Sequence, residues 1–249
     1  MNTREQYRFD DFTTSNYVKL LQLTKERYPF HSYAEAKTLD RYVVWRHDVD
    51  LSPHRALALA RIEANAGVRS TYFLNFHSEF YNLLEKSVMS MVHDIAAMGH
   101  HIGLHFDHVA YGVEDLDSAE PLMDRERTLL SSTFGVPVDV FSFHYTNTFS
   151  RLADMEMCAG MQNATSRHFR ERAAYCSDST GIWRFERLED VLLSGEQQRI
   201  QVLTHPELWQ DEAMSPAMRY KRCVYGRADS VWSWINAFLA EGGHLLVED

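Results

Sequence analysis

The sequence predicts an α/β fold with a mainly parallel sheet. Short apolar segments with the character of buried strands alternate with amphipathic segments of helical periodicity, and this alternation is typical of βαβ units. No internal repeat and no linker rich in proline, glycine or serine divides the 249 residues, so we expect a single domain over residues 1–249. Residues 1–40 are expected to form a helical extension packed on it.

Start and stop signals bound the predicted helices. Ser52 is a good N-cap, Pro53 suits the first helical position, and Gly67 suits a helix end. Glycine also follows two of the later amphipathic segments. We expect strands at residues 42–45, 71–74, 102–105, 138–143, 202–204 and 244–247, and helices at residues 52–66, 88–98, 121–134 and 229–240.

Composition and charge exclude several classes of protein. The formal net charge of −10 argues against a nucleic-acid partner, because phosphate binding requires concentrated positive charge. No apolar segment approaches the length of a membrane span and the first residues do not resemble a signal peptide, so we expect a cytoplasmic protein. Cys158, Cys176 and Cys223 are odd in number and widely spaced, which does not fit a disulfide framework or a thiolate zinc site.

Aspartate or histidine residues stand at the ends of four predicted strands. In parallel sheets the active site lies beyond the carboxyl ends of the strands, so these side chains are expected to gather at one edge of the sheet. They are Asp48 and Asp50 after residues 42–45, His105 after residues 102–104, His144 after residues 138–143, and His205 after residues 202–204.

Asp48 and Asp50 are expected to act together. They are two residues apart, so in extended backbone their side chains point the same way. Two carboxylates on one side repel each other unless a cation or a shared proton relieves them, and one can then bind a metal while the other takes a proton. The alternative is that one of them caps the following helix, but Ser52 already fills that position.

The histidines offer further ligands. His105 and His108 are three residues apart, close enough to bind one metal ion from a turn or helix start. Asp107 is an alternative ligand, because borderline metals accept carboxylate oxygen as well as imidazole. His205 precedes Pro206, so its backbone is extended and its ring is expected to project past the sheet. The alternative for His205 is a core histidine bonded to a backbone carbonyl.

Four motifs in this order resemble those of the polysaccharide deacetylase family, also called the NodB-homology or carbohydrate esterase type. The pattern is most similar to the family's intracellular branch, in which Asp-x-Asp replaces an adjacent Asp pair. The resemblance covers roughly residues 40–210 and implies a distorted (β/α) barrel of about seven parallel strands. The motifs are Arg46-His47-Asp48-Val49-Asp50, Gly99-His100-His101-Ile102-Gly103-Leu104-His105, Phe141-Ser142-Phe143-His144 and Leu203-Thr204-His205-Pro206.

The resemblance also implies roles for single residues. By motif position, Asp48 matches the family's catalytic base and Asp50 its first metal ligand. His105 matches the first histidine ligand, and His205 matches the catalytic acid.

Two positions depart from the family pattern. The family's second metal histidine lies four residues after the first, where this chain has Val109. We therefore assign the third ligand to His108, with Asp107 or His144 as alternatives. The family's arginine motif, which orients the base, is absent, and we expect Arg46 to supply that positive charge.

The predicted function is a metal-dependent hydrolase that removes an N-acyl group, usually acetyl, from a sugar or saccharide precursor. Zinc is the expected divalent ion, with an Asp base that takes a proton from water and a His acid that protonates the leaving amine. Two alternatives stay open: hydrolysis of an amide in a small non-sugar compound, and a degenerate barrel that binds a saccharide or partner without turnover. Aromatic residues expected near the site are Tyr72, Tyr111, Tyr145 and Trp209.

Overall fold

The structure, a computed structural model, describes residues 3–145 and 154–244. An eight-stranded sheet lies at its centre. The strands are β1 (Tyr42–Val49), β2 (Thr71–Leu74), β3 (His101–Phe106), β4 (Val140–Phe143), β5 (Met157–Cys158), β6 (Met161–Asn163), β7 (Ala174–Ser177) and β8 (Arg199–Thr204).

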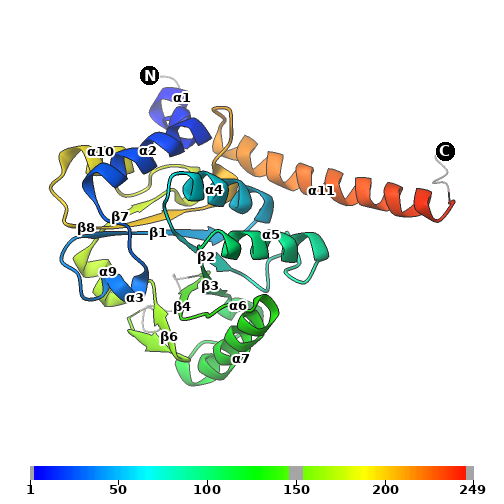
Figure 1. Cartoon of the computed structure of the whole chain (residues 1–249), viewed down its shortest axis with the longest axis horizontal. Helices are drawn as coiled ribbons and strands as arrows, with labels where there is room; N and C mark the ends of the chain where they lie inside the picture. The colour runs from blue at the N-terminus through cyan, green and yellow to red at the C-terminus, as the bar shows by residue number, and fades with distance from the viewer. Residues whose placement is uncertain (1–2, 146–153, 245–249) are drawn as a thin grey trace.

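Helices surround this sheet (Figure 1). The α-helices are α1 (Thr3–Gln6), α2 (Thr14–Arg27), α3 (Tyr33–Ala36), α4 (Pro53–Asn65), α5 (Lys86–Ala97), α6 (His108–Tyr111), α7 (Leu116–Phe134), α9 (Arg167–Arg172), α10 (Leu188–Ser194) and α11 (Pro216–Glu241). The 3₁₀ helices are η1 (Phe9–Phe12), η2 (Ser179–Gly181) and η3 (Pro206–Leu208).

The strand order is β5-β6-β4-β3-β2-β1-β8-β7. Only β5, which pairs antiparallel with β6, departs from parallel pairing in this sheet of the described residues. The predicted α/β class with about seven parallel strands is therefore confirmed. In the described part of the chain β5 and β7 are the two edges of the sheet, so strand pairing does not close this curled sheet into a complete barrel.

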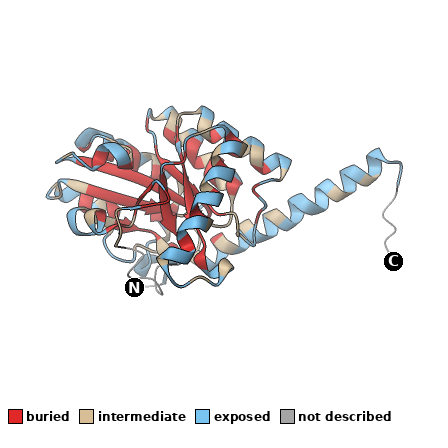
Figure 2. Ribbon diagram, turned by 90° about the horizontal axis from the view of Figure 1, so that it is seen from below, coloured by how far each residue is buried: buried red, intermediate tan, exposed pale blue. Residues whose placement is uncertain are grey.

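Alternate residues of the strands face two different cores. In β1, Val43 and Trp45 pack with α2 and α10, whereas Tyr42 and Val44 face the other side with Phe73 of β2. All eight residues of β1 are buried, and Figure 2 shows the strands as the buried centre of the molecule. Because side chains alternate along a strand, the side that carries Tyr42 and Val44 also carries Asp48, and Asp50 follows in the same alternation.

A close contact inside the sheet explains one glycine of the second motif. A Cβ atom on Gly103 of β3 would lie 2.6 Å from the ring of Phe73 on the neighbouring strand. Glycine is thus required at this position for the ring to fill the space between the strands.

The predicted elements differ from the structure mainly at their ends. Helix α4 has the expected Ser52 cap and Pro53 start, and Gly67 follows it with φ 68°. Helix α7 begins before Pro121, because the side chain of Asp115 accepts a hydrogen bond from the Ser118 N–H and caps an earlier turn.

The last third of the chain differs most. Helix α11 is one 26-residue helix that begins at Pro216, whereas the sequence predicts a helix only over residues 229–240. In the predicted strand 244–247, His244 is not in a strand and residues 245–247 lie outside the described residues. Within the described ranges, no helix is long and apolar enough to cross a lipid bilayer.

Candidate active site

Three strand ends bring Asp50, His105 and His144 together. Asp50 follows β1, His105 lies in β3, and His144 follows β4. Oδ1 of Asp50 lies 3.3 Å from Nε2 of His105 and 3.4 Å from Nδ1 of His144, and the two nitrogens are 3.2 Å apart. One oxygen and two imidazole nitrogens therefore converge on one point.

This spacing fits a metal ion. Zinc binds carboxylate oxygen and imidazole nitrogen tetrahedrally at about 2.0–2.2 Å, which places neighbouring ligand atoms roughly 3.3 Å apart. The three atoms satisfy that spacing, and among the described residues they form a group that could hold a metal ion. A hydrogen bond of 2.7 Å between Nδ1 of His105 and Ser142 Oγ fixes the ring so that Nε2 faces Asp50.

The two imidazoles also stabilise the ionised form of Asp50. Burial raises the pKa of this carboxyl group, but the adjacent His105 and His144 more than offset burial and hold the pKa well below its ordinary value. A carboxylate that stays ionised is available as a metal ligand at neutral pH.

Asp48 lies beside the three ligands but has a different environment. Nη2 of Arg46 donates to Asp48 Oδ2 at 2.7 Å, and this oxygen is 3.7 Å from Nε2 of His105. Both Asp48 and Arg46 are almost fully buried. Oδ1 of Asp48 is buried and accepts no hydrogen bond from the described residues, so this oxygen has an unused hydrogen-bonding capacity.

His205 approaches the group from the opposite side. Its Nε2 lies 3.7 Å from Oδ2 of Asp50. Its Nδ1 is 2.6 Å from Oδ1 of Asp178, a fully buried carboxylate that also accepts from the His205 backbone N–H and from Nε1 of Trp209. Burial lowers the pKa of His205, but Asp178 outweighs burial and raises that pKa to about 10. The ring is thus held with a proton on Nδ1 and with Nε2 toward the site.

The structure does not bring the other two predicted ligands to the group. Asp107 caps α6, since its Oδ1 accepts from the N–H groups of Val109 at 2.9 Å and Ala110 at 3.2 Å. His108 is buried with its ring centroid 6.2 Å from that of Phe143. Because the chain turns into α6 at Asp107, the residue after it leaves the strand direction. The group that could hold a metal ion contains His144, one of the alternatives, in the place predicted for His108.

Sequence reasoning missed Asp178 and Glu207. Asp178 follows β7, a short segment without a clear apolar pattern, so its position beside the histidine of the last motif was not expected. Glu207 is buried in η3, and its Oε2 accepts no hydrogen bond from the described residues. Burial and the nearby Asp50 raise the pKa of Glu207 to about 8. The only feature of the sequence that could have indicated Glu207 is its position two residues after His205.

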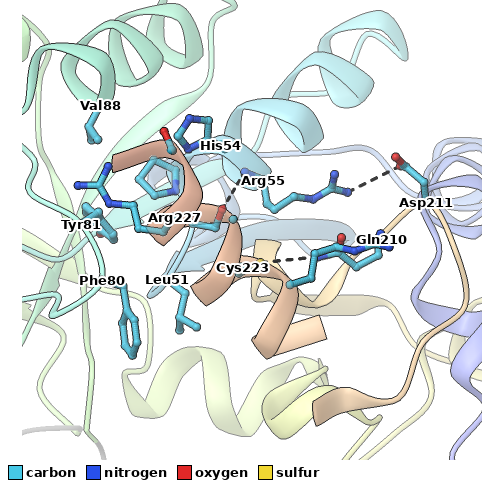
Figure 3. A pocket seen from close by; sticks show the side chains of 15 residues that line it. Leu51, His54, Arg55, Phe80, Tyr81, Val88, Gln210, Asp211, Cys223 and Arg227 are labelled. Atoms are coloured by element: carbon cyan, nitrogen blue, oxygen red, sulfur yellow. Dashed lines mark hydrogen bonds and ion pairs between the residues drawn. The ribbon is translucent and has the colours of Figure 1, made fainter. Parts of the chain in front are cut away.

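A cavity of about 370 Å³ lies beside this site, between the start of α4 and the first half of α11 (Figure 3). Leu51, His54, Phe80 and Arg227 are among its lining residues. The cavity lining includes neither the three candidate ligands nor Asp48 and His205, so the candidate chemistry lies outside this cavity.

Comparisons with known proteins add a likeness of fold. No family model matches the chain, and no curated protein matches it. The chain is similar to solved deacetylases. The chitin deacetylase of the fungal pathogen Colletotrichum lindemuthianum is 14% identical with a TM-score of 0.45, over 74% of this chain and 81% of that one.

Two peptidoglycan deacetylases are also similar. The Bacillus subtilis enzyme, solved as a mutant, is 9% identical with a TM-score of 0.44, over 82% of this chain and 97% of that one. The Bdellovibrio bacteriovorus enzyme is 19% identical with a TM-score of 0.41, over 76% of this chain and 51% of that one. These sequence identities and TM-scores are too low for the likeness to indicate a function. A function therefore has to be inferred from the geometry of the site.

Proposed function

We propose that this protein is a metal-dependent hydrolase that removes an N-linked acyl group, acetyl in particular, from a saccharide. The convergence of Asp50, His105 and His144 on one point, at the spacing that zinc requires, is the observation that carries this proposal. Asp48 and His205 flank that point, which gives the site a carboxylate and an imidazole for proton transfer.

Asp50, His105 and His144 would hold the divalent ion, and zinc suits one oxygen and two imidazole nitrogens. When bound, this ion supplies Lewis-acid polarisation of the acyl carbonyl and of a water. Ser142 contributes by holding the His105 ring in place.

Asp48 is assigned as the general base. Its free Oδ1 accepts a proton from the attacking water, and a new C–O bond forms as that O–H bond breaks. The Arg46 guanidinium holds the other oxygen at 2.7 Å. This contact prevents the carboxylate from rotating away.

His205 is assigned as the general acid. Asp178 keeps a proton on Nδ1 of His205 and favours the doubly protonated ring. Nε2 of His205 therefore carries a proton that it can donate. Transfer of this proton to the amide nitrogen lets the C–N bond break, with a neutral amine and a carboxylic acid as products. An unprotonated amide nitrogen is a poor leaving group, which is why the acid is needed.

An exposed ring at the site supports a saccharide as the substrate. Tyr145 follows His144 directly, its ring centroid is 4.4 Å from that histidine's, and 48% of the residue is exposed. An exposed aromatic face beside a reaction centre is suited to stacking on a sugar ring. Tyr72 and Trp209 are fully buried and unavailable for this role.

The test compares two histidine variants. The protein is stripped with a chelator, one equivalent of zinc is returned, and acetate release from an oligomer of N-acetylglucosamine is measured. We expect wild type and His108→Gln to bind zinc and release acetate, and His144→Ala to lose both. Acetate release that continues in the stripped protein would overturn the metal-dependent mechanism. Zinc binding without acetate release from this or other N-acetyl saccharides would overturn the proposed substrate class.

A further inference from the structure

Helix α11 extends far beyond the rest of the molecule (Figures 1 and 2). Arg219, near its start, is the one buried residue of the helix. Every residue from 228 to 241 is exposed or half-buried. Helices gain most of their stability in water from the packing of an apolar face, so a surface that packs against residues 228–241 is expected.

This part of the helix carries an apolar stripe, formed by Val231, Trp234, Ile235 and Phe238. The spacing i, i+3, i+4, i+7 places all four on one face. Trp234 is 65% exposed and Phe238 is 60% exposed, and their rings stack at 5.4 Å. Ser233 and Asn236 lie on the opposite face, so the segment is amphipathic.

A groove runs between the stripe and the body of the protein. It has a volume of about 810 Å³ and is lined by Lys86, Ser87 and Ser90 of α5 and by Ser230, Val231 and Trp234 of α11. The ion pair between Arg227 and Glu85 joins the two walls near the middle of α11. This α5–α11 groove therefore has a polar wall on α5 and an apolar wall formed by Val231 and Trp234 of α11.

The charges on α11 and on the α5 wall favour a second copy of this chain over a membrane surface as the occupant of the groove. Residues 228–241 contain Asp229 and Glu241 but no lysine or arginine, whereas Lys86 lies on the α5 wall of the groove. Helices that bind membrane surfaces carry lysine and arginine on their polar face, which this segment lacks. An antiparallel copy of the same helix instead places its Glu241 near Lys86.

We propose that the stripe and the α5–α11 groove form a two-fold interface between two copies of this chain, in which α11 of each copy lies antiparallel in the groove of the other. A two-fold axis requires one surface that fits itself, and a stripe beside its own groove meets this requirement. Trp234 and Phe238 of the stripe are each at least 60% exposed, which leaves on the order of 300 Å² of aromatic surface. Val231, Ile235 and the α5 wall of the groove would add to this area toward the roughly 800 Å² per partner of a standard interface.

Sedimentation equilibrium of the full chain tests the proposal with two matched double variants. Val231→Glu with Trp234→Glu places two charges three residues apart on the stripe. Ser233→Glu with Asn236→Glu places the same charges at the same spacing on the opposite face. At micromolar concentration we expect wild type and the opposite-face variant to have about twice the 29.0 kDa chain mass, and the stripe variant to be monomeric.

A third variant, Ser90→Glu, tests the groove by itself, because this residue lies on α5 and outside the helix that pairs. We expect it to raise the dimer dissociation constant at least tenfold. A monomeric wild-type protein, a dimer that the stripe variant leaves intact, or a dimer insensitive to Ser90→Glu would each overturn the assignment. Sedimentation of wild type with neutral phospholipid vesicles in place of self-association would show that the stripe binds lipid and would also overturn it. None of these outcomes depends on catalytic activity.

Discussion

Asp48 and Asp50 are chemically identical and only two residues apart, yet they have different partners. Asp50 faces two imidazole nitrogens, whereas Asp48 faces the Arg46 guanidinium. We therefore expect Asp50→Asn to lose the metal. Asp48→Asn should keep the metal and lose turnover by about 10²–10⁴-fold, the usual contribution of a general base. Metal content and acetate release, measured on the same samples, separate the two effects. Retention of metal by both variants would contradict the division of roles.

His205 is expected to act on the leaving group. A general acid matters most for a poor leaving group such as an amine and least for one that leaves as a stable anion. His205→Ala should therefore retain metal and lose much more kcat/KM on an N-acetyl saccharide than on an activated aryl acetate. Equal losses of kcat/KM on both substrates would instead indicate that His205 is a metal ligand or a structural residue.

Asp178 is expected to work through His205 and not on the substrate. Its carboxylate holds Nδ1 of that ring and raises the ring's pKa. Asp178→Asn should lower this pKa, so the alkaline limb of the rate profile on an N-acetyl saccharide should move to lower pH. The profile on an activated aryl acetate, which needs no acid, is the control. An unchanged alkaline limb on the saccharide would contradict the assignment.

His144, the candidate third ligand, shows what residue spacing alone does not reveal. His105 and His108 are close in sequence, but β3 ends before the second of them. His144 is 39 residues from His105, and the register of β3 and β4 places Ser142 opposite His105. Two residues further along β4 the side chain points to the same face again. The sequence offered His144 only as an alternative ligand, and the pairing of these two strands is what places it beside His105.

At the scale of elements, apolar patterning predicted the strands that carry a buried face. Strands β1, β2, β3, β4 and β8 were expected near their observed positions. Strands β6 and β7 were missed because their sequences, Met-Gln-Asn and Ala-Tyr-Cys-Ser, contain few large apolar residues. Since Asp178 directly follows β7, the missed strand also concealed the partner of His205.

A buried polar network ties β1 to its neighbours on the face opposite the site. Glu63 of α4 accepts hydrogen bonds from Tyr17 of α2 and Tyr72 of β2 and pairs with His47 of β1 at 2.7 Å. His47 in turn hydrogen-bonds Thr204 of β8 at 2.7 Å. The network therefore fixes the relative positions of β1 and β8, the strands that lead to Asp50 and His205.

Loss of the Glu63 charge should be costly. Loss of one partner from a buried hydrogen-bonded network leaves the other groups unsatisfied at a cost of about 1–3 kcal/mol, more for charged groups, so Glu63→Gln should lower the free energy of unfolding by about that amount at pH 7. Burial raises the pKa of Glu63, but His47 outweighs burial and holds it below the ordinary value. Its stabilisation is therefore present above the unfolded pKa of about 4.3 and is lost as pH falls through the lower folded pKa.

Denaturant unfolding at several pH values tests this network. The difference between wild type and Glu63→Gln should be largest near pH 7 and should shrink below about pH 4.3. Glu26→Gln, on the exposed face of α2, is the matched control and should change little at any pH. A pH-independent difference for Glu63→Gln would contradict the ionised state of this residue.

At the scale of the whole molecule, a metal bound by Asp50, His105 and His144 would join three different strands. A ligand that binds only the folded state stabilises it by RT ln(1 + [L]/Kd), about 2.7 kcal/mol at a concentration of 100 Kd. For a chain of this length, 1 kcal/mol shifts Tm by about 2–4 °C. Return of zinc to the chelated protein should therefore raise Tm by roughly 5–10 °C. His108→Gln should keep the full shift and His144→Ala should lose it. Equal shifts in both variants would place the bound metal elsewhere.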